Sequence, residues 1–155
     1  MATNPIPTGF EGVTPYLIIK NATGAIDFYK TVFGAEEVMR MSTPHGAIGH
    51  AEIKIGNGHV MLTDENIEAG WKGPQTVGGN PVSLVVYVAD CDATFSTAIT
   101  NGATETKPME DQFYGDRMGT ITDPFGHIWS IGTHVEDVSP EEMQARMAKM
   151  MEGNA

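Results

Sequence analysis

AIDFYKTVFGA, residues 25–35, is the stretch of sequence that decides the fold. Its apolar residues recur at helical spacing and would form one buried helix face: Ile26, Tyr29, Val32 and Phe33. Gly34 follows at the position where helices commonly end in a left-handed residue. A short apolar strand, Val13 to Lys20, precedes the turn-prone residues 21–24. The pattern predicts a strand, a turn, and a helix from Ala25 to about Phe33.

Three more strands are expected after this helix. Residues 37–41 and 50–55 have strand-like composition, and Gly56-Asn57-Gly58 is a strong hairpin signal that leads into residues 59–63. The first half of the chain therefore predicts a βαβββ module.

The same order of elements returns in the second half. A strand is expected at residues 82–88, a helix from about Cys91 to Thr100, two further strands, and a last strand at residues 127–133. Phe33-Gly34-Ala35 recurs as Asn101-Gly102-Ala103, and Gly58-His59-Val60 as Gly126-His127-Ile128, both at a separation of 68 residues. Common helix-glycine and turn-glycine patterns can recur by chance, but two recurrences at one separation favour an internal repeat.

The remaining segments flank and join these modules. The predicted limits are an N-terminal arm at 1–12, a first module at 13–64, a linker at 65–80, a second module at 81–135, and a C-terminal helix and tail at 136–155. Ser139-Pro140-Glu141-Glu142 is a capping box, so a helix should begin at Pro140. Its methionines share one side and predict docking on the same domain or on a second subunit: Met143, Met147, Met150 and Met151.

Composition excludes several classes of protein. The chain has 155 residues with 9 Lys and Arg against 20 Asp and Glu, a formal net charge of -11 that repels nucleic acids and anionic membranes. Cys91 is the single cysteine, so no intramolecular disulfide can form, and a cytoplasmic location follows as the default. We find no signal-peptide pattern and no apolar stretch long enough to span a membrane.

The sequence resembles the glyoxalase and bleomycin-resistance superfamily, also called the vicinal oxygen chelate superfamily, and within it the PhnB-like members. The resemblance rests on AIDFYK with FGA at residues 25–35, YGDR at 114–117, and DPFGHIW at 123–129. It implies an α+β fold in which two βαβββ modules form a curved mixed sheet around a cleft, often across a homodimer. In this chain we expect a C-terminal helix, beginning at Pro140, in addition to the two modules.

Alternation along the strands then predicts which side chains face the cleft, because successive residues point to opposite sides of a sheet. Residues 51, 53 and 55 should face the helix, which leaves His50, Glu52 and Lys54 towards the cleft. In the second module, Ser83, Val85 and Tyr87 should face the cleft, with Ile128, Ser130 and His134 beside them.

Metal-dependent members of the superfamily place a His, Gln or Glu at four strand positions of the cleft. The resemblance assigns these positions to Thr14, Leu62 (or Met61, if the hairpin shifts by one residue), Ser83 and Ser130. Hydroxyl and apolar side chains do not offset the lost hydration of a divalent ion. We therefore expect no metal and no other cofactor.

His50 and Glu52 are the candidate catalytic residues, should the protein be an enzyme. A histidine on the cleft face can transfer protons near neutral pH, or can be a hydrogen-bonded structural residue. His59 and His127 should point away from the cleft and be structural, and His45 should lie in an exposed loop.

The expected ligand-binding residues are aromatic, polar and apolar side chains of the cleft strands and of the loop before the second hairpin. They are Tyr16, Ile18, Tyr87, Gln112, Phe113, Tyr114, Arg117, Ser130 and His134. Arg117 with Tyr114 could hold a carboxylate or phosphonate by charge-assisted hydrogen bonds. In the alternative, Arg117 forms an internal ion pair with Asp116 or Asp123.

Two functions are compatible with these residues. The first is binding of a small aromatic or hydrophobic molecule in a metal-free cleft, as in bleomycin resistance by sequestration. The second is a lyase, isomerase or dioxygenase of the glyoxalase type, with relocated metal ligands such as His50, Glu52 and His134, or with His50 and Glu52 as an acid–base pair. A purely structural or partner-binding domain that uses the C-terminal helix fits less well.

Overall fold

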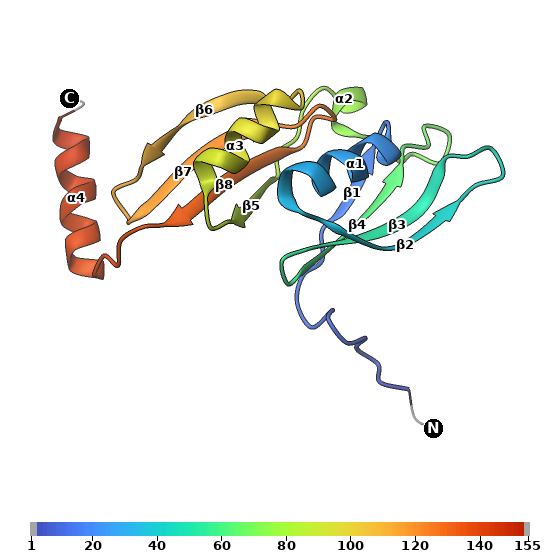
Figure 1. The fold of residues 1–155 in the computed structure, drawn as a ribbon, viewed down its shortest axis with the longest axis horizontal. Helices are drawn as coiled ribbons and strands as arrows, with labels where there is room; N and C mark the ends of the chain where they lie inside the picture. The colour runs from blue at the N-terminus through green and yellow to red at the C-terminus, as the bar shows by residue number, and fades with distance from the viewer. Residues whose placement is uncertain (1–2, 154–155) are drawn as a thin grey trace. The chain divides into compact units, whose positions relative to one another are not determined.

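The computed structural model describes residues 3–153, so the first two residues of the expected arm and the last two of the expected tail lie outside the described part. The elements in chain order are β1 (Tyr16–Ile19), α1 (Ala22–Phe33), β2 (Glu36–Ser42), β3 (Ile48–Ile55), β4 (Gly58–Asp64), α2 (Pro74–Val77), β5 (Ser83–Tyr87), α3 (Cys91–Thr100), β6 (Thr104–Asp111), β7 (Asp116–Thr122), β8 (Ile128–His134) and α4 (Pro140–Glu152). Figure 1 shows them along the chain.

Two four-stranded sheets have the same strand order, β1-β4-β3-β2 and β5-β8-β7-β6. In each sheet the first strand of the repeat pairs parallel with the last, and the other pairs are antiparallel. The predicted α+β class, the two βαβββ repeats and the C-terminal helix are thereby confirmed.

The chain divides into two compact units. The first extends to Pro81 and includes Pro124–Gly126, and the second comprises Val82–Asp123 and the chain from His127 onward. The module limits expected from the sequence stay a prediction, because this division follows contacts and not the repeat.

α1 begins three residues earlier than expected and ends where expected. The side chain of Asn21 accepts a hydrogen bond from the backbone N–H of Gly24, which brings Ala22 to Gly24 into the first turn of the helix. Gly34 has a φ of 65°, in the left-handed region that glycine adopts without steric cost. α1 lies against the first sheet as α3 lies against the second (Figure 1).

The helix-facing side of each sheet forms its core. The largest fully buried side chains are, in the first unit, Ile19, Ile26, Tyr29, Ile53 and Leu62, together with Ile48 at the start of β3, and in the second unit Ile121 and Ile131. Asp123 supports the second core, because its carboxylate accepts hydrogen bonds from the backbone N–H of His127 and the indole N–H of Trp129. These two hydrogen bonds connect the first residue of the DPFGHIW stretch to its fifth and seventh residues and so hold the turn before β8 in place.

α4 begins at Pro140, as predicted, and Ser139 Oγ accepts a hydrogen bond from the backbone N–H of Glu142. The helix extends away from the second sheet (Figure 1), and none of its residues is buried. Docking of its methionine face on the same domain is therefore wrong for the single chain, and docking on a second subunit stays a prediction. No helix among residues 3–153 is long and apolar enough to cross a membrane.

Candidate functional site

Each sheet has one side packed on its helix and an opposite side, which we call the open face. In the first sheet, cross-strand pairing places Met39, Glu52, Met61 and Tyr16 in one row across β2, β3, β4 and β1. Met41 and His50 form a second row, with Ile18 on the same face. Tyr16, Ile18, His50 and Glu52 thus lie on the open face, where alternation predicted His50 and Glu52.

His50 and Glu52 share this face but do not pair with each other. The hydroxyl of Tyr16 lies 2.8 Å from Nδ1 of His50 and forms a hydrogen bond with it. Glu52 instead bonds through Oε1 to Nδ1 of His59, at 2.7 Å. Partial burial raises the pKa of the Tyr16 hydroxyl, which therefore stays protonated at neutral pH.

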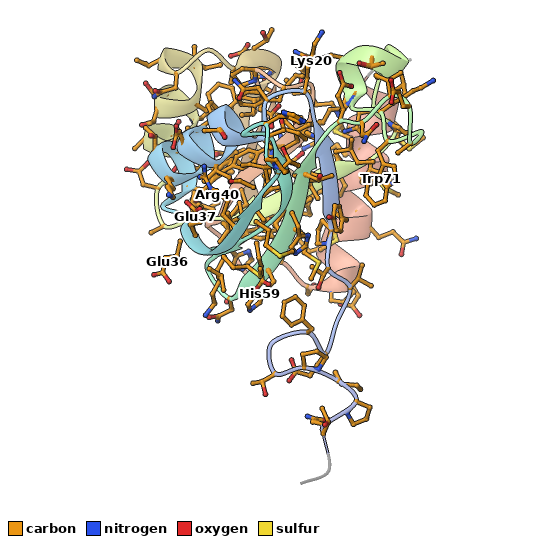
Figure 2. The ribbon with its side chains drawn as sticks, turned by 90° about the vertical axis from the view of Figure 1, so that its right-hand side faces the viewer. Lys20, Glu36, Glu37, Arg40, His59 and Trp71 are labelled. Atoms are coloured by element: carbon orange, nitrogen blue, oxygen red, sulfur yellow. The ribbon has the colours of Figure 1, made fainter. Side chains whose placement is uncertain are left out.

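His59 was expected to point away from this face, and that expectation is wrong. Ile55 pairs with Gly58 across a two-residue turn, so Lys54 faces His59 and both lie on the side of Glu52. The ring of Phe10 packs on His59 with centroids 4.5 Å apart, so the N-terminal arm covers this part of the face. Figure 2 shows His59 at the end of the sheet nearest the arm.

The open face of the second sheet carries a hydrogen-bonded group of Tyr87, Asp116, His134 and Asp137. Tyr87 donates to Oδ2 of Asp116 at 2.5 Å, and Oδ1 of Asp116 lies 2.7 Å from Nδ1 of His134. Nε2 of His134 lies 2.9 Å from Oδ1 of Asp137. The bonds to Asp137 and Asp116 raise the pKa of His134, and the bond to Asp116 raises the pKa of Tyr87. The pKa of Asp116 is lowered, mainly by the hydrogen bond from the Tyr87 hydroxyl.

A pocket of about 380 Å³ lies on the same unit, next to this group. It is lined by Lys107, Pro108, Glu110, Gln112, Tyr114, Met118, Thr120 and Ser130. Thr120 and Ser130 lie opposite each other on β7 and β8 with their hydroxyl oxygens 3.1 Å apart. Three of the expected ligand-binding residues, Gln112, Tyr114 and Ser130, are thus brought together. Phe113 packs edge-on against Tyr114, at 5.2 Å between ring centroids.

Arg117 does not belong to this group. Its guanidinium binds both carboxylate oxygens of Asp92 on α3, at 2.7 and 2.8 Å, and Asp111 at 3.0 Å. Because Asp116 is on the open face, its neighbour Arg117 points to the helix side. The alternative ion pairs of Arg117 with Asp116 and Asp123 are therefore wrong, and its ligand contact stays a prediction that these ion pairs do not support.

The four positions that the resemblance assigned to metal ligands hold no strong metal donor. Leu62 is fully buried in the core, and Met61 stands on the open face in its place. Thr14, Ser83 and Ser130 offer hydroxyl groups, and that of Ser130 already bonds to Thr120. A thioether and three hydroxyls do not fit a divalent ion. Within residues 3–153, no three His, Cys, Asp or Glu side chains group so that they could hold a metal ion.

Sequence reasoning missed Asp116 and Met118 as open-face residues. Alternation from Thr120 backwards along β7 would have found both, since residues 116, 118 and 120 share one side. It also missed Trp71, whose ring lies 5.7 Å from that of Tyr16. No periodic signal marks Trp71, because it lies in the irregular segment between the modules.

Comparison with known proteins agrees with this architecture. The model of the family described as "Glyoxalase/Bleomycin resistance protein/Dioxygenase superfamily" matches residues 13–131. A Mycobacterium bovis protein, Mb0911c, is 40% identical over 99% of this chain and 100% of its own. Among solved structures, TioX from Micromonospora sp. ML1 is similar at a TM-score of 0.60, with 24% identity over 83% of this chain and 100% of its own. The PhnB protein from Bacillus cereus is similar at a TM-score of 0.65, with 18% identity over 79% of this chain and 99% of its own.

Proposed function

Since the chain belongs to the glyoxalase/bleomycin resistance protein/dioxygenase superfamily, we propose that it binds a small aromatic or hydrophobic molecule on its open faces without a metal ion. The observation that carries this proposal is the pocket beside β7 and β8, where Tyr114, Met118, Thr120 and Ser130 line one hollow. Ligand pockets combine apolar surface with placed polar groups. Here Pro108, Tyr114 and Met118 supply the apolar surface, and polar or charged side chains form most of the lining.

The side chains of the pocket suit a flat apolar ligand. Met118 has a flexible, polarizable thioether that adapts to an aromatic ring, and the hydroxyl of Tyr114 lies 3.7 Å from its sulfur. Tyr87 and Val85 stand exposed on the same face, with more than half of each side chain accessible. The hydroxyls of Thr120 and Ser130 can orient a polar substituent of the ligand.

The metal-free part of the proposal rests on donor chemistry. Met61, Thr14, Ser83 and Ser130 stand where relatives carry metal ligands, and none of them is an imidazole or a carboxylate. A stoichiometric divalent metal in protein purified without chelator would overturn this part.

A fluorescent probe tests the pocket directly. 8-Anilino-1-naphthalenesulfonate, a flat aromatic anion, is titrated into the wild type and into a Ser130→Leu variant, whose larger side chain fills the pocket without changing charge. Ser96→Leu, on an exposed position of α3, is the matched control. We expect saturable binding that Ser130→Leu weakens and Ser96→Leu leaves intact. Equal binding by all three proteins contradicts the pocket.

An enzyme of the glyoxalase type is the second candidate, and the Tyr16–His50 hydrogen bond favours it. In a metal-free form, His50 would exchange protons with a ligand while Tyr16 orients its ring, and Glu52 would act through His59. In a metal-dependent form, the expected ligands His50, Glu52 and His134 would have to be brought together by the metal, because no three such side chains group within residues 3–153. Calorimetric titration of chelator-treated protein with nickel, zinc, manganese and iron(II) separates the two. Tight binding that His50→Gln abolishes supports the metal-dependent form, and no binding excludes it.

We also propose that the protein is a cytoplasmic homodimer of the PhnB-like branch. The motifs at residues 25–35 and 114–129 support the branch, and a single buried cysteine suits a reducing compartment. The exposed methionines of α4 support self-association, because an apolar helix face is commonly covered. Sedimentation velocity measures the oligomer, and a monomer at micromolar concentration contradicts the dimer.

A further inference from the structure

We propose that a second pocket, located wholly in the first unit, binds a small organic ammonium ion with an apolar body. The pocket has a volume of about 440 Å³ and lies between the ends of β3 and β4 and the loop that follows β4. Its lining residues apart from Tyr16 were not among the expected site residues, so the inference goes beyond the proposed function.

Two aromatic rings form one wall of this pocket. The rings of Tyr16 and Trp71 meet edge to face, with centroids 5.7 Å apart and an interplanar angle of 70°. Both side chains are large and remain exposed, at 41% and 45% of their possible area. Figure 2 shows Trp71 beside β1. The negative face of an aromatic ring attracts a cation, and most strongly so in tryptophan.

The charges that line the pocket are negative. Asp64 and Glu65 contribute two carboxylates, and no Lys, Arg or His is among the lining residues. Oxygen Oε2 of Glu65 accepts hydrogen bonds from the Thr76 hydroxyl at 2.6 Å and from the Gly73 N–H at 3.2 Å. These bonds, that of Thr76 first, lower the pKa of Glu65, so it is charged at neutral pH. The pocket therefore attracts cations and repels anions.

Asp64 fixes the floor of the pocket. Its two carboxylate oxygens accept the backbone N–H groups of Ala22 and Ile48, each at 2.7 Å. With both oxygens engaged in this way, Asp64 contributes charge and not a coordination position. Together with the single partly free carboxylate of Glu65, this arrangement suits a diffuse organic cation better than a metal ion, which needs several direct oxygen ligands.

The rim that carries Trp71 is held in place before any ligand arrives. Asn66 and Trp71 exchange two backbone hydrogen bonds of 2.8 and 2.9 Å, and the Asn66 side chain accepts the N–H of Ala69 at 3.0 Å. Gly70 closes the turn with a φ of 82°. A rim already in its binding conformation costs less ordering entropy when the ligand binds.

One hydroxyl of the pocket lacks a partner. Thr43 lines the pocket, and its Oγ1 is the buried side-chain polar atom without a hydrogen bond in the described part of the chain. A buried polar atom without a partner is costly, but this oxygen is closed to solvent and so does not face the open part of the pocket. The ligand is therefore defined by the aromatic wall and the carboxylates, as a cationic head with an apolar body.

Choline and 3,3-dimethyl-1-butanol test the proposal, because they have the same shape and differ by one positive charge. Binding is followed by the indole N–H signal of Trp71 in ¹H–¹⁵N spectra, assigned with Trp71→Phe, while buried Trp129 is the internal reference. We expect choline to bind about tenfold more tightly than the neutral alcohol. Equal affinities, or no shift of the Trp71 signal, would overturn the proposal.

Two variants in one loop make the test specific. Glu65→Gln removes a charge from the pocket wall, and Glu68→Gln removes the same charge from an exposed position that does not line it. Glu65→Gln is expected to weaken choline binding several-fold more than Glu68→Gln, and an equal effect argues for general surface charge. Ser130→Leu in the second unit should leave choline binding unchanged, so a failure of this proposal and a failure of the proposed function are distinguishable.

Discussion

Nδ1 of His134 lies 2.7 Å from Oδ1 of Asp116, while its other ring nitrogen lies 2.9 Å from Asp137. Both nitrogens face carboxylates, and only the protonated imidazolium donates two hydrogen bonds. His134 therefore ties the end of β8 both to β7 and to the loop that leads to α4. With both nitrogens engaged, His134 holds the carboxylate of Asp116 in place beside the Tyr87 hydroxyl.

This arrangement predicts a stability that depends on pH. The pKa of folded His134 is raised above 6.5, so its contribution is complete below pH 6.5 and is lost as pH rises through the folded value. The pKa of Asp116 is lowered below 3.8, so its contribution is present above pH 3.8 and is lost as pH falls through the folded value. His134→Asn should lower Tm most between pH 3.8 and 6.5 and progressively less at higher pH.

Thermal unfolding of His134→Asn and of the wild type across this range checks the prediction. His45→Asn, at an exposed loop position, is the control and should follow the wild type. A loss of Tm in His134→Asn that stays constant or grows as pH rises would show that His134 acts as a neutral residue.

Gly132→Ala should disturb the open face of the second sheet. A Cβ at this position would lie 2.7 Å from Cε of Met118, so the Met118 side chain must shift. We expect a loss of about 1 kcal/mol in unfolding free energy, typical of mild overpacking, and weaker binding of the aromatic probe. Gly49→Ala, where the nearest atom is 3.5 Å away, is the matched control in a strand of the first sheet.

The coupling to Met118 can be measured by a double-mutant cycle of chemical denaturation. Met118→Ala frees the space that the new methyl group needs, so the cost of Gly132→Ala should shrink in that background. Additive effects would mean that the two residues do not compete for the space seen in the structure.

Gly115→Ala should lower the free energy of unfolding much more than Gly46→Ala, although both glycines have a positive φ. Gly115 has a φ of 94°, and a Cβ there would lie 2.1 Å from the carbonyl oxygen of Glu136. We expect a loss of roughly 3 kcal/mol or more, from backbone strain and a clash that no side-chain rotation relieves. Gly46→Ala, with a φ of 85° and no atom within 4 Å, should cost only about 1 kcal/mol. Similar losses in urea denaturation would contradict this account.

Arg117→Lys tests the assignment of Arg117 to the helix side. Lysine keeps the charge but cannot form the two-point contact that the guanidinium makes with Asp92. Tm should therefore fall, while the affinity for the aromatic probe stays at the wild-type value. A weaker affinity for the probe at unchanged Tm would instead indicate that Arg117 contacts the ligand.

Local patterns were enough to predict the elements and most of their faces. The helix period in residues 25–35 and the strand alternation in residues 50–55 depend only on neighbouring residues. They placed Ala51 and Ile53 in the core and His50 and Glu52 on the open face, as the structure has them.

Errors appeared where a face depends on the pairing of two strands. Since a shift of one residue in a hairpin turns every side chain of the strand over, the two-residue turn between Ile55 and Gly58 decided that His59 meets Glu52. The same pairing put Leu62 in the core and Met61 on the open face. For Arg117, the partner Asp92 stands 25 residues away in the chain, on a helix.

The amino-acid sequence by itself determined a repeated βαβββ fold and the absence of strong metal donors at the four expected ligand positions, because periodicity and residue chemistry are local properties. Only the tertiary structure decided which residues of the open faces meet. It joined His50 to Tyr16, Glu52 to His59 and His134 to Asp116, and it brought Trp71 from an irregular loop to the ring of Tyr16. Such contacts depend on strand register and loop closure, which no single stretch of the sequence specifies.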